Sequence, residues 1–277
     1  MALKLRILYS LGSRYKPREL ILEEERHEVG RGEVADLSSA SIYSDISNST
    51  FNQIKNIDLE GSFGTKIDTI ARHLLWIRKR DPGAKAVIFS QYRDFLAVLG
   101  KAFRQFSIGF TSMGRKGGVD KFKNDPSIEC FLLDAKTNSS GLNLINATHV
   151  FLCEPLINTA LELQAIARVH RIGQHQPTTV WMYLVDGTVE KSVYEISVSR
   201  RISHIGERPI GASDRSADVL ERRIDAANSF ELEQTPLAKL LAKEPNGGEM
   251  VQKEDLWGCL FNHSKYLAPG PNNMPRV

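Results

Sequence analysis

The sequence predicts an α/β fold, a parallel β-sheet with helices on both faces, followed by a mixed helical and irregular tail. From residue 64 to about residue 201, apolar segments of strand length alternate with amphipathic segments of helix length. Several strand segments, such as AKAVIF at residues 84–89, are continuously apolar, which is typical of strands buried on both faces. The connections between them are short, so right-handed crossovers between parallel strands are expected.

The first expected helix covers residues 65–80. Apolar side chains recur there at spacings of three to four residues: Ile67, Ile70, Ala71, Leu74, Leu75 and Ile77. The sequence Asp81-Pro82-Gly83 then ends the helix. Strands are expected at residues 84–89, 107–111, 128–133, 148–153 and 178–185, and further helices at residues 92–106, 118–124, 158–171 and 188–201.

Composition divides the 277 residues into a polar connector (1–60), the α/β lobe (61–205) and the tail (206–277). With 42% hydrophobic and 25% charged residues, the chain has the composition of a soluble globular protein. No apolar run approaches the roughly 20 residues of a membrane span, and Arg6 interrupts the apolar start, so neither a membrane segment nor a cleaved signal peptide is expected. The three cysteines form no CxxC pair, so we expect a reducing compartment and no metal site.

Charge is unevenly distributed although the formal net charge is only +3. Residues 61–110 contain nine Lys and Arg against three Asp, whereas residues 206–277 contain nine basic and eleven acidic residues. The basic excess indicates either a solvated helix face or a phosphate-binding surface.

The most specific segment is QAIARVHRIGQ at residues 164–174. On a helix, Gln164, Arg168 and Arg171 share one stripe, so two guanidinium groups point the same way. Paired guanidiniums suit phosphate because each forms bidentate bonds and stays charged. The alternative is an exposed helix face whose arginines pair with carboxylates.

Two further segments place small polar residues where a phosphate could bind. Ser90 and Gln91 follow a buried strand, at the edge where open α/β sheets place ligands, and SSGLNL at residues 139–144 contains small residues that allow close backbone approach. Each segment is also compatible with an ordinary loop or helix start.

The string HRIGQ preceded by QAxxR resembles motif VI of the Swi/Snf-type ATPases in helicase superfamily 2. The resemblance implies a RecA-like lobe, the second of two lobes that enclose ATP with Mg²⁺, the nucleotide being held mainly by the first lobe. It implies that Arg168 and Arg171 are arginine fingers, that Gln164 and His170 support the site, and that Gly173 permits the turn after the helix.

KAVIFSQYRDFL at residues 85–96 resembles motif IV, and SSGLNL resembles motif V. The resemblance implies contacts to the backbone of double-stranded DNA from Ser90, Gln91, Ser140, Gly141 and Asn143. Many family members have two glycines at the positions of Ser139 and Ser140, so this loop departs from the family pattern.

Longer stretches within residues 61–201 resemble the SHPRH-type subgroup of Swi/Snf-like DNA translocases, which carry a RING ubiquitin ligase between the lobes. RYKPREL at residues 14–20 resembles the connector after the RING in fungal members, whereas Met182 stands where many relatives have arginine. The resemblance implies nuclear localisation, a role in DNA repair and partnership with the ubiquitin machinery.

No GxxxxGK[ST] loop, DExH-type acidic box or RING array of cysteine and histidine occurs in the chain. We therefore expect an incomplete ATPase that does not hydrolyse ATP alone: a fragment, a truncated gene model or a degenerate copy. The alternative is a non-catalytic interaction module that keeps the same fold. DLWGCLF at residues 255–261 is either a docking segment for such a partner or a segment that packs on its own domain.

Overall fold

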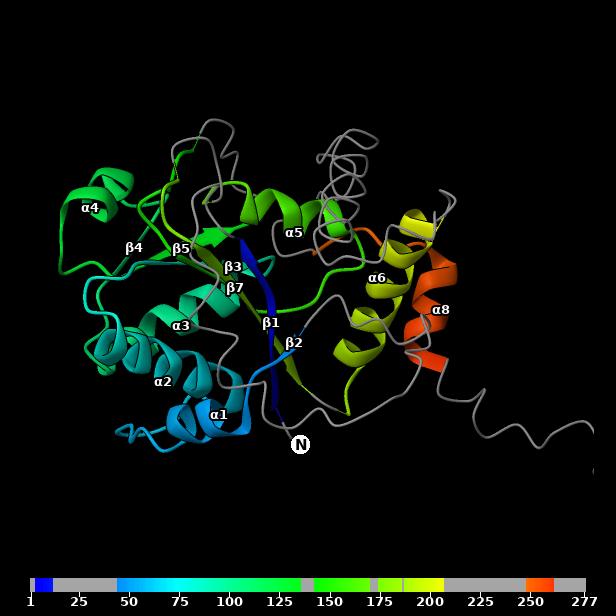
Figure 1. The fold of residues 1–277 in the computed structure, drawn as a ribbon, viewed down its shortest axis with the longest axis horizontal. Helices are drawn as coiled ribbons and strands as arrows, with labels where there is room; N and C mark the ends of the chain where they lie inside the picture. Colours follow the sequence, from blue (N-terminus) through cyan, green and yellow to red (C-terminus); the bar gives the residue numbers. More distant parts are fainter. Residues whose placement is uncertain are drawn as a thin grey trace, which may run out of the picture.

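The computed structural model describes residues 3–11, 44–135, 142–169, 174–185, 187–206 and 248–261. Within these residues a seven-stranded sheet forms the centre of the molecule, with the strand order β2-β1-β7-β6-β3-β5-β4 (Figure 1). The strands are β1 (Leu3–Leu11), β2 (Ser44–Asp45), β3 (Ala86–Ser90), β4 (Phe110–Ser112), β5 (Cys130–Asp134), β6 (His149–Leu152) and β7 (Thr178–Val185). The helices are α1 (Asn48–Lys55), α2 (Thr65–Arg80), α3 (Arg93–Gln105), α4 (Gly118–Asn124), α5 (Thr159–Ile166), α6 (Val189–Gly206) and α8 (Lys253–Phe261).

The five strands from β7 to β4 are all parallel, which confirms the predicted sheet. In the register of the central strand, Ala86 of β3 lies opposite Cys130 of β5 on one side and His149 of β6 on the other. Each of these strands begins within about two residues of its predicted position except β4, which starts three residues later, at Phe110.

Apolar side chains on the two faces of the sheet form two separate core clusters. In β3, Ile88 belongs to one cluster, together with Ile70 of α2 and Phe103 of α3. Its neighbour Val87 belongs to the other, together with Leu161 of α5. Successive residues of a strand point to opposite faces, so this division confirms the prediction that helices cover both faces of the sheet.

Helix α2 has the predicted bounds, and its ends show why. The Asp68 side chain accepts hydrogen bonds from the Phe63 N–H and the Ser62 hydroxyl, which fixes the chain entering the first turn. At the other end, Gly83 has a φ of 93°, a conformation that favours glycine.

The N-terminal segment adds structure that the sequence analysis did not predict. Strand β1 pairs antiparallel with β7 along its whole length, with a register shift between Ile7 and Tyr9, and β2 pairs with β1. Helix α1 packs against α2 and places Ile54 in the core. Part of the predicted connector therefore extends the sheet of the lobe.

Near the C-terminus, α8 packs beside α6, as Figure 1 shows. Cys259 on α8 is buried, whereas Leu256, Trp257 and Leu260 are at least half exposed. The contact with α6 and the burial of Cys259 support the alternative that the DLWGCLF segment packs on its own domain, and the docking alternative stays a prediction. The helices expected around residues 217–227 and 236–242 lie outside the described residues, and no helix in the described part is long and apolar enough to cross a membrane.

Candidate functional site

The candidate site lies at the carboxyl edge of the parallel sheet. Ser90 ends β3, Asp134 ends β5, and Glu154 follows β6 by two residues. Because β3 pairs with both neighbours in parallel, these residues lie at the same edge. This is the edge at which open α/β sheets bind ligands.

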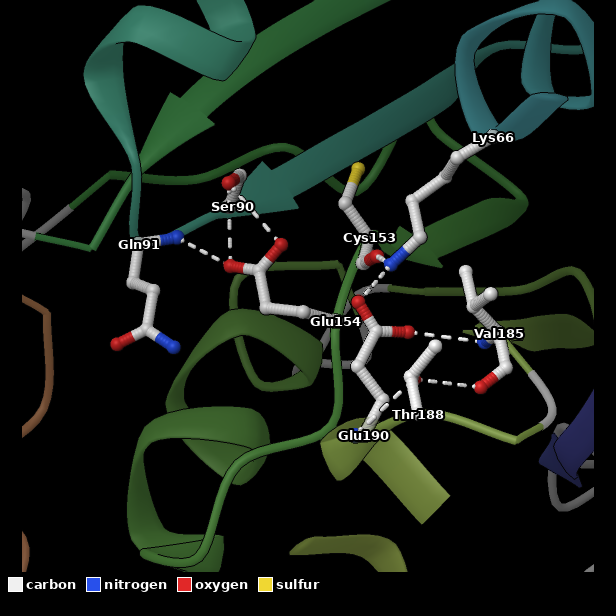
Figure 2. A network of polar contacts seen from close by, with 8 residues as sticks. All are labelled: Lys66, Ser90, Gln91, Cys153, Glu154, Val185, Thr188 and Glu190. Carbon is white, nitrogen blue, oxygen red and sulfur yellow. Dashed lines mark hydrogen bonds and ion pairs between the residues drawn. The ribbon is translucent and has the colours of Figure 1, made fainter. Parts of the chain in front are cut away.

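A buried carboxylate joins the ends of β3 and β6 (Figure 2). Glu154 accepts a hydrogen bond from the Gln91 backbone N–H at 2.6 Å and bonds from the Ser90 hydroxyl at 3.1 Å. The Ser90 oxygen in turn accepts a hydrogen bond from the Tyr92 N–H, and this local bond stabilises the turn between β3 and α3. Burial raises the pKa of Glu154 to about 7, although the bonds from Gln91 and Ser90 oppose that shift.

A second polar connection joins α2 to the same edge, also seen in Figure 2. Lys66 donates to the Cys153 carbonyl at 2.8 Å and pairs with Glu190 at 2.5 Å. The other oxygen of Glu190 accepts from the Val185 N–H, at the end of β7. Lys66 thereby ties the start of α2 to the end of β6 and to the first turn of α6.

The C-terminal segment is attached to this edge through Glu249. Its carboxylate accepts hydrogen bonds from the backbone N–H groups of Ile157 and Asn158, both at 2.9 Å, and from the Asn158 side chain. Its own N–H donates to the Gln91 amide oxygen at 2.5 Å. A Cβ at Gly248 would lie 2.4 Å from that same oxygen, so glycine permits the close approach.

The structure places three of the five predicted DNA contacts. Ser90 is fully buried and donates to Glu154, and Gln91 is 5% exposed and is engaged by Glu249. Asn143 is half-buried, and its side chain accepts from the Ile145 N–H at 3.2 Å. A direct contact from Ser90 to DNA would therefore require Glu154 to move. Ser140 and Gly141 lie outside the described residues.

The predicted helix over residues 158–171 is shorter than expected. Helix α5 ends at Ile166, and the N–H groups of Arg168 and Val169 bond to carbonyls three residues back, in a tightened turn. The Arg168 carbonyl accepts from the Leu144 N–H at 3.0 Å, a bond that draws this turn toward the preceding loop. The prediction of one continuous α-helix from 158 to 171 was therefore wrong at residues 167–169. The shared face of Gln164, Arg168 and Arg171 stays a prediction, because Arg171 and the Gln164 side chain lie outside the described residues.

Arg168 itself is 9% exposed, and the hydrogen bond to Leu144 sets it beside the loop that carries Asn143. Segments resembling motifs V and VI are therefore in direct contact. His170, Arg171 and Gly173 lie outside the described residues, as does the side chain of Gln164. Gln174, the last residue of the motif, donates to the carbonyls of Ile145 and Ala147 and fixes the end of motif VI against the same loop.

Sequence reasoning missed the two carboxylates that organise the site, Glu154 and Glu249. Glu154 directly follows the apolar run of β6, so the rule that selected Ser90 and Gln91 would also have selected it. Glu249 carries no such signal, because its partners lie more than 90 residues away in the chain.

The described residues contain no group of three His, Cys, Asp or Glu side chains placed to hold a metal ion. Arg168 is a chemical match for an anionic group such as a nucleotide phosphate, because its guanidinium remains charged and forms bidentate bonds. The three cysteines are free and buried.

Comparison with known proteins identifies the domain. Residues 65–173 match the helicase conserved C-terminal domain. The chain is 43% identical over 157 residues to the E3 ubiquitin-protein ligase SHPRH of Mus musculus, 37% identical over 164 residues to the DNA repair protein RAD5 of Cryptococcus neoformans, and 29% identical over 225 residues to the ATP-dependent helicase IRC20 of Saccharomyces cerevisiae.

These matches cover 55%, 56% and 77% of this chain but only 9%, 13% and 14% of the three relatives. The C-terminal part of the Fun30 ATPase domain aligns with 66% of this chain and 59% of its own length, at 21% identity and a TM-score of 0.46. The chain thus spans a small part of its curated relatives. Residues 65–173 are a helicase conserved C-terminal domain of the kind found in Swi/Snf-type helicase-like proteins.

Proposed function

We propose that this chain is the second lobe of an ATP-dependent DNA translocase of the Swi/Snf type. In this proposal residues 61–205 form the motor lobe, with the preceding segment as its connector and residues 206–277 as its tail. The lobe supplies arginines to ATP that is held with Mg²⁺ by a first RecA-like lobe. It does not hydrolyse ATP alone, because the sequence lacks the phosphate loop and the acidic box.

The observation that carries the proposal is the hydrogen bond from the Leu144 N–H to the Arg168 carbonyl. It couples the candidate finger to the loop bearing Asn143, so a shift of one segment is transmitted to the other. Such a coupling is what a motor needs if closure over the nucleotide is to move a bound strand.

The bound nucleotide supplies the phosphoryl group that is transferred. Arg168 and Arg171 would offset the negative charge that develops on it during transfer. Because Arg168 is largely covered in the single lobe, we expect its side chain to reach the nucleotide only when the two lobes close.

DNA contact is proposed at Gln91, Ser140, Gly141 and Asn143, to phosphates and without sequence readout. Ser90 would support this surface through Glu154, which holds the Gln91 backbone. Binding that depends on phosphates weakens steeply with salt. The relatives' names further support a link to DNA repair and ubiquitin ligation, and a role in DNA repair would place the protein in the nucleus.

A non-catalytic interaction module is the second candidate. Two observations favour it: the Gln91 amide oxygen is already engaged by Glu249, and α8 exposes Leu256, Trp257 and Leu260. Such a module would bind partners through this tail and would not respond to ATP.

The two candidates are separated by joining this chain to a first RecA-like lobe and measuring ATP turnover with and without a 30-base-pair duplex. A translocase lobe gives turnover that duplex DNA stimulates and that rising salt suppresses, while the chain alone gives none. Turnover that remains at the level of the first lobe alone, with or without DNA, contradicts the proposal and favours the interaction module.

A further inference from the structure

The basic excess within residues 61–110 is only partly used inside the lobe. One group is used internally: Lys66 pairs with Glu190, Arg72 donates to the Ile57 carbonyl, Arg78 pairs with Glu129, and Lys85 donates to the carbonyls of Phe122 and Asp125. Lys101 and Arg104 on α3 form no ion pair with a carboxylate of the described residues, and the same holds for Arg115 after β4. These three exposed cations gather around one concavity.

The concavity is a groove of about 720 Å³ between α3 and the edge strand β4. Its floor is apolar and consists of Leu96, Ala97, Gly100, Phe110 and Leu132. Arg93, at the start of α3, pairs with Asp134 at one end of the groove. The remaining cations on its walls therefore face solvent without a neutralising partner among the described residues.

Two guanidinium groups are held against the groove floor. The Arg115 guanidinium carbon lies 4.8 Å from the centre of the Phe110 ring, and that of Arg104 lies 5.8 Å from it. Contact with an aromatic ring restricts the freedom of an arginine side chain and keeps its hydrogen-bond donors free for an anion. Both charges are thus positioned beside apolar surface rather than dispersed in solvent.

The combination of an apolar floor with exposed cations favours some anionic ligands over others. The phosphates of a DNA backbone could meet these cations, but the backbone carries no large apolar group to fill the floor, which would stay uncovered. A peptide with acidic side chains and one or two large apolar side chains matches both parts, since the apolar groups fill the floor and the carboxylates meet Lys101, Arg104 and Arg115. A groove of this volume is large enough to bury such anchors.

We propose that the groove between α3 and β4 is a docking site for an acidic peptide segment of a partner protein, anchored by a large apolar side chain. The groove reaches the carboxyl edge at Asp134 but shares no residue with the hydrogen-bond network of Glu154, and the inference does not depend on the motor function. It assigns a role to Lys101 and Arg104, two cations of the basic excess that form no ion pair with a described carboxylate.

The test is a selection of a phage-displayed random 12-residue peptide library on the full chain, followed by fluorescence anisotropy with the enriched peptides. We expect enriched peptides to combine acidic residues with at least one large apolar residue. Their affinity should fall at least tenfold with Arg104→Glu/Arg115→Glu, and likewise with Ala97→Trp, which fills the floor without changing the charge. The matched control, Lys121→Glu/Lys123→Glu on α4, changes charge equally outside the groove and should alter affinity less than twofold.

Unfolding of each variant in urea identifies any loss of folding, and Ala97→Trp keeps the test decisive if the charge reversal disrupts the chain, because Ala97 is exposed on α3. The proposal is overturned if no peptide is enriched above the empty support, or if the enriched peptides lack acidic residues. It is also overturned if the control reduces affinity as much as the groove variants. Full competition by a 12-nucleotide single strand that needs the same three cations would assign the groove to nucleic acid instead.

Discussion

The carboxyl edge of the sheet and the groove beside α3 use polar residues in opposite ways. At the edge, Ser90, Gln91 and Glu154 are buried and satisfy one another, and Glu249 adds the C-terminal segment. In the groove, Arg104 and Arg115 are exposed beside apolar surface and have no carboxylate partner among the described residues. The difference teaches that buried polar contacts fix geometry, whereas unpaired exposed charges remain available to a ligand.

The largest expected effect on stability comes from Glu154→Ala. The change leaves the Gln91 N–H and the Ser90 hydroxyl buried without an acceptor, so we expect a loss of about 2 to 4 kcal/mol in the free energy of unfolding. Arg115→Ala in the groove should change it by less than about 0.5 kcal/mol. Urea unfolding measures the free energy of unfolding of both variants. Similar losses for Glu154→Ala and Arg115→Ala would contradict the claim that only the polar contacts at the carboxyl edge fix the geometry.

The pH dependence of stability gives an effect of similar size. Burial raises the pKa of Glu154 from 4.5 to about 7, so the folded state keeps a proton that the unfolded state releases. The resulting stabilisation is complete below pH 4.5 and is lost as pH rises through 7, a change on the order of 3 kcal/mol. We expect Glu154→Gln, which cannot titrate, to lack this loss.

Two histidines, the buried His73 and the half-buried His149, act in the opposite direction. Desolvation lowers the pKa of His73 well below its usual value and that of His149 to about 4. Their contribution to the free energy of unfolding is therefore lost as pH falls below 6.5. The readout is therefore the difference between wild type and Glu154→Gln in urea midpoints from pH 4.5 to 8. If the urea midpoints of wild type and Glu154→Gln differed by the same amount at every pH in this range, the raised pKa of Glu154 would be contradicted.

A smaller effect is expected at the partly buried ion pair. Lys66→Met removes the bond to the Cys153 carbonyl and the pair with Glu190, whose side chains are 15% and 25% exposed. We expect a loss of about 1 to 2 kcal/mol, less than for Glu154→Ala, because solvent screens the charges. The exposed Lys79→Met serves as control, and an equal change in both variants would mean that Lys66 does not tie α2 to α6.

The smallest effect concerns the C-terminal segment. Glu249→Ala releases the amides of Ile157 and Asn158 and frees the Gln91 side chain, so duplex DNA should bind about threefold more tightly, near 0.6 kcal/mol. Fluorescence anisotropy with a 30-base-pair duplex measures this, with Asp120→Ala, which removes an exposed carboxylate on α4, as the matched control. Weaker binding of DNA by Glu249→Ala would show that the segment supports the contact instead of covering it.

Local patterns were sufficient to predict the parallel sheet and α2, since the apolar spacing of Ile67 to Ile77 and the Asp81-Pro82-Gly83 stop lie within a few residues of one another. Strand β1 was missed because its partner β7 lies more than 160 residues further along the chain. The early end of α5 was missed because the local spacing of apolar residues does not signal that the N–H groups of Arg168 and Val169 bond three residues back.

The sequence predicted where the candidate site lies in the fold, but it did not predict which side chains contact one another there. Ser90 and Gln91 lie at the expected edge, yet their burial depends on Glu154 and Glu249, which come from elements 60 to 160 residues away. Periodicity and motif spacing do not report such pairings, because they concern contacts between segments distant in sequence.

The central claim is that Arg168 acts on a nucleotide presented by another lobe. The most direct measurement is ATP turnover of this chain joined to a first RecA-like lobe, comparing wild type, Arg168→Ala and the groove control Arg115→Ala, with urea midpoints to verify folding. The account predicts that Arg168→Ala lowers turnover by about 10³-fold or more while Arg115→Ala stays within twofold of wild type. Turnover of a folded Arg168→Ala protein within twofold of wild type would contradict it.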